Sequence, residues 1–141
     1  MDLVSRQLVP TLAQPAFRDY VSAALRGQTL PDVAEFASLR RAAIMIGNAY
    51  EDLGVLVKNN IIDKALFFDR YSGPIKRAWN RLNAYAAFCR EATGSTNLWE
   101  NFEYLTVLSE DWDQIHPSSY PAGLRRLPVH NPWPIAPASA G

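Results

Sequence analysis

The sequence predicts an all-α protein, a small bundle of about four to five helices followed by an extended, proline-rich C-terminal tail. Three observations predict this class. Apolar residues between Asp32 and Trp112 recur at spacings of three and four, which is the period of an amphipathic helix. No stretch sustains the alternation of period two that is typical of strands. Prolines crowd both ends of the chain, and between Pro31 and Pro117 only Pro74 interrupts the pattern.

A first helix is predicted from Pro15 to Arg26. Proline suits the first helical turn because its missing N–H would have no partner there, and Gly27 is a good terminator. A second, longer helix is predicted to begin near Asp32. With Glu35 three residues later, Asp32 resembles a capping box, in which two side chains bond the free N–H groups of a helix start.

The second helix is predicted to end at Asn59-Asn60, since asparagine tolerates left-handed geometry. Its apolar face is formed by residues spaced by three and four, namely Leu39, Ala43, Ile46, Tyr50, Leu53 and Val57. Gly47 and Gly54 lie on the flank of this face, seven residues apart. Because glycine costs helix stability, the pair indicates either close approach by a neighbouring backbone or simple tolerance.

A short third helix is predicted over residues 63–71, with Asp63 as its N-cap. The Ser-Gly-Pro run that ends at Pro74 is expected to break it, and Pro74 to start a fourth helix that ends at Gly94. The apolar face of this fourth helix is formed by Ile75, Trp79, Leu82, Ala86 and Cys89.

A fifth helix is predicted to follow Asn97 as its cap, with Glu100 at the capping-box position, and to extend to Trp112. Its apolar face is formed by Leu98, Phe102, Leu105 and Trp112, with Ser109 in the same row. The short connection to the fourth helix predicts an antiparallel hairpin between the two.

Charge divides between these last two helices. Residues 74–90 include four basic side chains and no acidic one, whereas residues 97–113 include five acidic side chains and no basic one. Opposite charges on paired helices would form modest surface ion pairs. The alternative is that the acidic helix presents a docking surface for a basic partner.

Residues 1–116 are therefore predicted to form a helical domain, and residues 117–141 a tail without any acidic residue. Within the tail, Trp133 lies between two prolines and follows Arg125 and Arg126. A proline-flanked aromatic anchor of this kind either folds back onto its own bundle or enters a groove on a protein partner. In the second case Arg125, Arg126 and Trp133 would bind that partner.

Composition argues against several classes of protein. The chain has 14 basic and 14 acidic residues in 141, so it lacks the basic excess with which nucleic-acid binders displace counterions. It has no apolar run near the roughly 20 residues that span a bilayer, and no signal-peptide pattern at its start. We therefore expect a cytoplasmic protein without a membrane span.

No catalytic, metal or cofactor site is predicted. Neither His116 nor His130 has a glutamate three residues before it, as a carboxylate-bridged di-iron bundle requires. Cys89 is the only cysteine, which excludes an intramolecular disulfide, and its place on an apolar face predicts a buried, inert thiol. No Gly-rich phosphate loop occurs in the sequence. The oligomeric state is left open.

Several fragments together resemble a known family. They are Tyr-Glu-Asp-Leu-Gly-Val-Leu-Val at 50–57 with Ile-Ile-Asp at 61–63, then Trp79 and Arg90, and Asn-Phe-Glu-Tyr-Leu at 101–105. Over about residues 33–112 the chain resembles the bacterial domain of unknown function 4760 family. The resemblance implies a helical fold and no established activity, so it transfers no catalytic residue. Many members carry membrane-spanning helices ahead of this domain, which this sequence does not show.

The resemblance directs attention to Glu51, Arg90 and Glu103. We expect Arg90 to bond Glu103 or Glu51 in a partly buried ion pair that fixes helix packing. The preferred function is a non-catalytic helical interaction or regulatory module. One alternative is an enzyme that uses Glu51 and Glu103 in a cleft between the second and fifth helices. Another is a weak nucleic-acid binder that uses Arg40, Arg41, Arg77 and Arg81.

Overall fold

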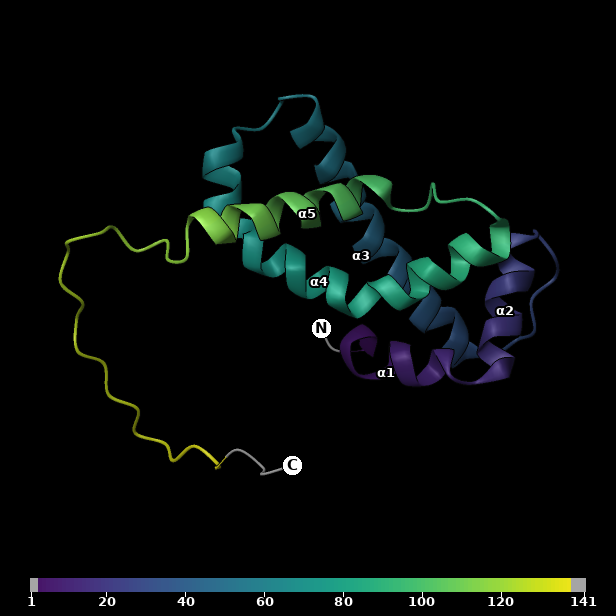
Figure 1. Cartoon of the computed structure of the whole chain (residues 1–141). Helices are drawn as coiled ribbons and strands as arrows, with labels where there is room; N and C mark the ends of the chain where they lie inside the picture. Colours follow the sequence, from purple (N-terminus) through teal and green to yellow (C-terminus); the bar gives the residue numbers. More distant parts are fainter. Residues whose placement is uncertain (1–2, 138–141) are drawn as a thin grey trace.

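The computed structural model describes residues 3–137 and contains, within that range, five α-helices and no strand. The helices are α1 (Leu3–Leu12), α2 (Pro15–Leu25), α3 (Ala34–Lys58), α4 (Lys64–Thr93) and α5 (Glu100–Ile115). The prediction of a small all-α bundle is confirmed. Figure 1 shows α4 and α5 packed as an antiparallel pair, with α3 crossing behind them and α1 and α2 at the far end of the molecule.

The first helix, α1, is not predicted by the sequence, because Pro10 lies inside it. Proline removes one backbone hydrogen bond from a helix and crowds the preceding turn. However, Val4, Leu8 and Leu12 recur every four residues, and all three are buried against the rest of the bundle. Burial of such side chains contributes about 1.5–3 kcal/mol each, which outweighs the effect of a proline near the helix end.

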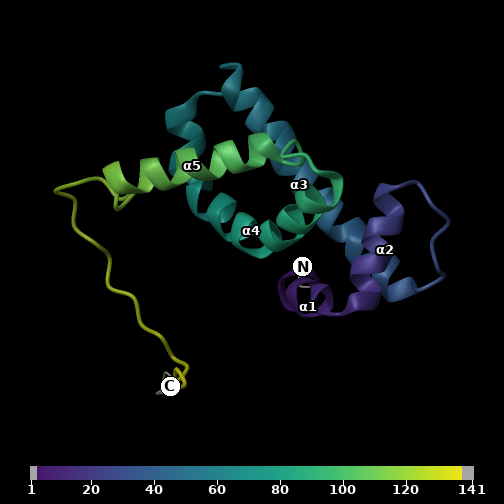
Figure 2. The same ribbon diagram turned by 45° about the vertical axis from the view of Figure 1, so that its right-hand side comes forward.

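The third and fourth helices predicted from the sequence are one continuous helix, α4, so the predicted break at Pro74 is wrong. Proline inside a helix bends it, and Figures 1 and 2 show α4 changing direction along its length. Phe68 is buried before the proline, and Ile75 and Ala78 are buried after it. Apolar packing on both sides therefore holds the two parts in one helix.

The predicted helix ends at Gly27 and at Asn59-Asn60 are confirmed. The helix α2 ends at Leu25, shortly before Gly27, and α3 ends at Lys58, shortly before Asn60, and these two residues are left-handed with φ of 67° and 59°.

Two further predicted ends, both in α4, are confirmed as well. The Asp63 side chain caps its start by accepting a 3.0 Å hydrogen bond from the backbone N–H of Leu66. Gly94 ends the helix in the left-handed conformation, with φ of 66°, which glycine adopts without a steric penalty. A helix is likewise found where the first one was predicted, since α2 begins at Pro15.

Two predicted N-caps are wrong. The N-cap of α3 is Val33, which makes no side-chain cap, so the capping box of Asp32 and Glu35 does not form. The N-cap of α5 is Trp99, in a left-handed conformation with φ of 57° and without a side-chain cap of its own, in place of Asn97. The free N–H groups at the start of α5 are bonded in another way, described below.

The predicted apolar faces of the long helices supply nearly half of the buried apolar side chains of the core. The buried members of these faces are Leu39, Ala43 and Val57 in α3, Ile75, Leu82, Ala86 and Cys89 in α4, and Phe102, Leu105 and Ser109 in α5. Phe17, Tyr20 and Val21 of α2 join them. The amphipathic pattern of the sequence therefore identifies correctly which side of each long helix faces inward.

Residues 116–137 follow α5 without a helix or strand, and every one of them is exposed. Figures 1 and 2 show this segment leaving the bundle. Residues 138–141 of the predicted tail, like residues 1–2 of the predicted domain, lie outside the described residues. Within the described range, none of the helices combines the length and the apolarity that crossing a bilayer requires.

Candidate functional site

The start of α5 is capped by a side chain from another helix. Glu51, on α3, accepts a 2.8 Å hydrogen bond from the side-chain amide of Asn101 and a 2.9 Å hydrogen bond from the backbone N–H of Phe102. The N–H groups of a first helical turn have no partner within the helix, and a negative charge there interacts favourably with the helix dipole. Glu51 therefore ties α5 to α3.

Two glycines let α5 approach α3 closely. A Cβ atom added at Gly47 would overlap the indole of Trp99, and one added at Gly54 would overlap the backbone carbonyl of Asn101. The Trp99 indole N–H also donates a 3.0 Å hydrogen bond to the side-chain oxygen of Asn48. Of the two interpretations that the glycine spacing left open, close approach by a neighbouring backbone holds at Gly54, whereas at Gly47 the close neighbour is the side chain of Trp99.

Aromatic packing completes this contact between α3 and α5. The rings of Tyr50 and Phe102 are stacked, with centroids 4.9 Å apart, and Trp79 of α4 meets Phe102 edge-on at 5.1 Å. Tyr50, Glu51 and Gly54, which belong to the fragment that resembles the family, thus all contact the first turn of α5. That fragment has a packing role in this chain.

Arg90 lies between the end of α4 and the start of α5. Its Nε donates a 3.0 Å hydrogen bond to the backbone carbonyl of Leu98, and its Nη1 lies 3.4 Å from the Glu103 carboxylate. The guanidinium also lies over the Trp79 ring, 5.8 Å from its centroid. Of the two acids considered from the sequence, Glu103 is the one beside Arg90, whereas Glu51 bonds the first turn of α5.

A second ion pair joins the opposite end of the same two helices. Lys76 of α4 pairs with Asp113 of α5, and the Ser72 hydroxyl donates a 2.8 Å hydrogen bond to the same carboxylate. The bond from Lys76, with a smaller contribution from Ser72, holds the pKa of Asp113 below its usual range. Basic and acidic side chains of the paired helices therefore meet at both ends.

Tyr85 and Cys89 form a buried titratable pair on the inner face of α4. Burial raises the pKa of the Tyr85 hydroxyl, and the adjacent Cys89 raises it further, while Arg40 opposes the shift. Burial also raises the pKa of the Cys89 thiol. Because the thiolate is the reactive form of cysteine, a buried thiol with a raised pKa is poorly suited to act as a nucleophile.

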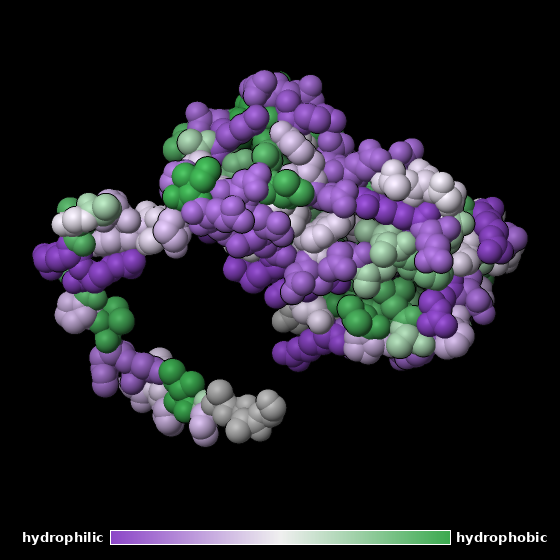
Figure 3. Space-filling view, in the orientation of Figure 1, coloured by the Kyte–Doolittle hydropathy of each residue, from purple (hydrophilic) through white to green (hydrophobic). Residues whose placement is uncertain are grey.

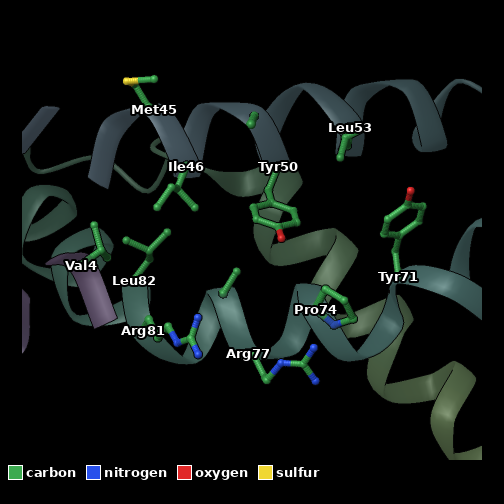
Figure 4. Close-up of a pocket in the computed structure, with 12 residues that line it drawn as sticks. Val4, Met45, Ile46, Tyr50, Leu53, Tyr71, Pro74, Arg77, Arg81 and Leu82 are labelled. Atoms are coloured by element: carbon green, nitrogen blue, oxygen red, sulfur yellow. The ribbon is translucent and has the colours of Figure 1, made fainter. Parts of the chain in front are cut away.

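A cavity with a volume of about 590 Å³ lies between α3 and α4 (Figure 4). Its walls are mainly apolar, with two tyrosines and two arginines among them. The lining residues are Val4, Met45, Ile46, Ala49, Tyr50, Leu53, Tyr71, Pro74, Arg77, Ala78, Arg81 and Leu82. No acidic side chain and no histidine belongs to this set.

The candidate acid–base residues do not converge on this cavity. Glu51 bonds the backbone N–H of Phe102, and Glu103 lies beside Arg90. His116, just after the end of α5, stacks on Trp112 with ring centroids 3.9 Å apart. Within the described part of the chain, no three His, Cys, Asp or Glu side chains gather closely enough to hold a metal ion.

The arginines considered for nucleic-acid binding occupy different surroundings. Arg77 and Arg81 line the cavity, whereas the Nε atom of Arg40 is buried and Arg41 is exposed on α3. The cavity itself is not predicted by the sequence. One available signal is Met45, an apolar residue outside the predicted apolar face of α3 whose side chain is 67% exposed.

The candidate tail residues differ in their contacts. The Arg126 guanidinium lies 3.9 Å from the centroid of the Tyr120 ring, and the Tyr120 hydroxyl donates a hydrogen bond to the Arg125 carbonyl. These three residues form a local turn. Trp133 lies beyond this turn, is 74% exposed, and its backbone N–H donates a 2.9 Å hydrogen bond to the Asn131 side chain.

These features define the protein as a small all-α bundle in which α5 docks on α3. The family described as "Domain of unknown function (DUF4760)" matches residues 6–112, from α1 almost to the end of α5. The chain therefore belongs to this family. Comparisons with curated proteins and with solved structures find no match.

Proposed function

We propose that this protein is a non-catalytic helical interaction module that binds a protein partner through its C-terminal segment. The observation that carries the proposal is the exposure of large apolar side chains along an extended chain. Between 62% and 96% of the accessible surface is exposed at Leu124, Leu127, Val129, Trp133 and Ile135. Figure 3 shows apolar atoms spaced along the segment, separated by polar ones.

The chemistry of the segment suits recognition by a groove. Trp133 lies between Pro132 and Pro134, and prolines limit the conformational entropy that an extended peptide loses on binding. Tryptophan and arginine are enriched among the residues that dominate binding energies at interfaces. The segment has no acidic residue, so Arg125 and Arg126 favour a partner with an acidic rim around an aromatic or apolar groove.

The contacts of the glutamates support a non-catalytic role. Glu51 is engaged by two donors at the start of α5, and Glu103 lies beside Arg90, so neither carboxylate points into the cavity. The proposal includes a cytoplasmic location. A single buried cysteine, Cys89, supports it, because disulfide-bonded proteins of oxidising compartments carry paired cysteines.

Affinity capture with variants of the immobilised chain tests the proposal. The full chain, a chain ending at Pro117, and the full chain with Trp133→Ala would be compared for the proteins that they retain. We expect partners that the full chain binds and that both changed chains lose. Leu66→Ala, which alters an exposed apolar residue on the bundle outside the cavity, is the matched control and should retain them. Identical partner sets for all four chains would contradict the proposal.

A further inference from the structure

The cavity between α3 and α4 has the dimensions of a small-molecule site. Its volume of about 590 Å³ lies within the roughly 300–1,000 Å³ typical of such sites. In Figure 4, α3 forms one wall with Ile46, Tyr50 and Leu53, and α4 forms the other. Val4 of α1 lies at one end and Tyr71 at the other.

Most of the lining can contribute only apolar contacts. Met45, at the rim, is 67% exposed, and in Figure 4 its side chain points away from α4, whereas Ile46 and Leu53 point toward it. Transfer of an apolar chain from water to such a wall is favourable in proportion to the apolar surface that is buried. The lining therefore favours a ligand with an apolar body.

The α4 side of the cavity adds two positive charges. Arg77 and Arg81 lie one helical turn apart on this side, and neither takes part in the salt bridges within the described residues, which join Lys76 to Asp113 and Arg90 to Glu103. No acidic side chain lines this cavity, while Arg77 also lines a neighbouring hollow that includes Glu110. A guanidinium binds carboxylate or phosphate through two parallel hydrogen bonds, so this edge favours an anionic group.

Two further donors are available inside the cavity. Tyr50 and Tyr71 both line it, and in Figure 4 the Tyr50 hydroxyl points from α3 toward α4. A phenol donates one hydrogen bond and remains neutral at physiological pH. An anionic oxygen held by an arginine could accept a second bond from one of these hydroxyls.

The ends of the cavity favour a small ligand over a partner helix. A helix with its side chains is about 10 Å wide, so residues at both ends of a groove limit how a helix can lie along it. Here the buried Val4 side chain lies at one end, beside Leu82, and Tyr71 lies at the other. A single chain of limited length, with its charged group on the arginine side, fits these boundaries.

We propose that the cavity between α3 and α4 binds a free, single-chain amphipathic anion of the fatty-carboxylate class. The apolar chain lies against Ile46, Leu53 and Leu82, and the carboxylate bonds Arg77 or Arg81. This site is separate from the C-terminal segment, so it stands or falls independently of the protein interaction proposed above.

Calorimetric titration of the full chain with dodecanoate below its micelle concentration tests the site, with dodecanol as the uncharged probe of equal chain length. We expect dodecanoate to bind one molecule per chain and dodecanol to bind at least about tenfold more weakly, since loss of about 1.4 kcal/mol of charge-assisted bonding is a factor of ten. This comparison needs no variant and so does not depend on the folding of one.

Variants then locate the ligand. Arg77→Gln with Arg81→Gln should weaken dodecanoate about tenfold or more while leaving dodecanol unchanged. Ala49→Phe, at an exposed lining position, should abolish binding of both by filling the cavity. Ala87→Phe, at an exposed α4 position outside the lining, is the matched control and should bind as the unchanged chain does.

Three results would overturn the proposal. The first is no saturable binding of dodecanoate. The second is equal binding of dodecanoate and dodecanol. The third is binding of dodecanoate that Ala49→Phe leaves unchanged.

If free dodecanoate does not bind, two further measurements show what the groove serves instead. Binding to vesicles of anionic phospholipid that Ala49→Phe abolishes would indicate a membrane surface. Capture of an acidic amphipathic helical peptide that Ala49→Phe abolishes would indicate a protein.

Discussion

The carboxylate of Glu51, on α3, accepts a hydrogen bond from the backbone N–H of Phe102, in the first turn of α5, at 2.9 Å. The two residues are 51 positions apart, so one side chain fixes where a distant helix begins. The N-cap residue of a helix usually accepts this bond with its own side chain. The N-cap of α5 is Trp99, whose side chain accepts no such bond. The stability of α5 therefore depends on α3.

Glu51→Ala should lower the free energy of unfolding by about 2 kcal/mol, because it removes a charged acceptor from two donors at a helix start. Glu51→Gln should cost less, since one amide oxygen still accepts while the interaction with the helix dipole is lost. Urea denaturation measures both. Asp52→Ala, at the exposed neighbouring position, should change stability by less than about 0.5 kcal/mol. Equal effects of Glu51→Ala and Asp52→Ala would contradict the cap.

Gly54→Ala should destabilise the protein, although the same change stabilises an exposed helix by about 1 kcal/mol. The new Cβ would overlap the backbone of Asn101, which cannot move unless α5 moves with it. Overpacking of this kind costs about 1–3 kcal/mol, so the melting temperature should fall. Ser38→Ala, at an exposed position of α3, should leave it unchanged or slightly higher. A higher melting temperature for Gly54→Ala would refute the close contact.

The inward faces of the long helices could be predicted from the sequence, because burial repeats with the helical period and leaves a residue-type signal. The cap of α5 could not. Glu51 bonds the backbone N–H of Phe102, and a backbone donor has the same chemistry at every position except proline. Sequence reasoning looks for side-chain partners, so it considers Arg90 as a partner of Glu51 or of Glu103. In the structure Arg90 lies beside Glu103.

Proline positions misled the prediction for a related reason. A proline has a local cost that the sequence displays, whereas the compensating burial of Leu8 near Pro10, or of Ile75 near Pro74, depends on helices distant in the chain. The cavity between α3 and α4 depends in the same way on how far apart two helices lie. The apolar Met45, which lies outside the predicted face, is one sequence signal that this side of α3 has a surface role.

Arg90→Ala should cost about 1–3 kcal/mol of stability, whereas Glu103→Ala should cost less than about 1 kcal/mol. Arg90 is largely buried and satisfies the Leu98 carbonyl at 3.0 Å, while Glu103 is half exposed and 3.4 Å away. Arg90→Lys should recover little, because lysine has no group that matches Nε. Urea denaturation of the three variants separates these contributions. If Glu103→Ala cost as much as Arg90→Ala, the ion pair and not the carbonyl bond would fix the α4–α5 loop.

Asp113 should make the stability of the protein depend on pH in the acid range. The bond from Lys76, followed by that from Ser72, lowers the pKa of Asp113 in the folded chain below its value of about 3.9 in an unfolded one. The contribution of this carboxylate is therefore fully present above about pH 4 and is lost as the pH falls through the lowered pKa. Because both side chains are about one-third exposed, it should not exceed about 1 kcal/mol.

Asp113→Asn removes the titrating group while keeping a side chain that Ser72 can still bond. Between about pH 5 and pH 2 the unchanged chain should lose up to about 1 kcal/mol more stability than this variant does. Thermal unfolding followed by circular dichroism across that range measures the difference, and Asp111→Asn, at an exposed position two residues earlier, is the matched control. Parallel stability curves for the unchanged chain and Asp113→Asn would show that the Lys76 contact adds nothing in solution. A steeper loss in the variant would reverse the sign of the linkage and exclude a lowered pKa.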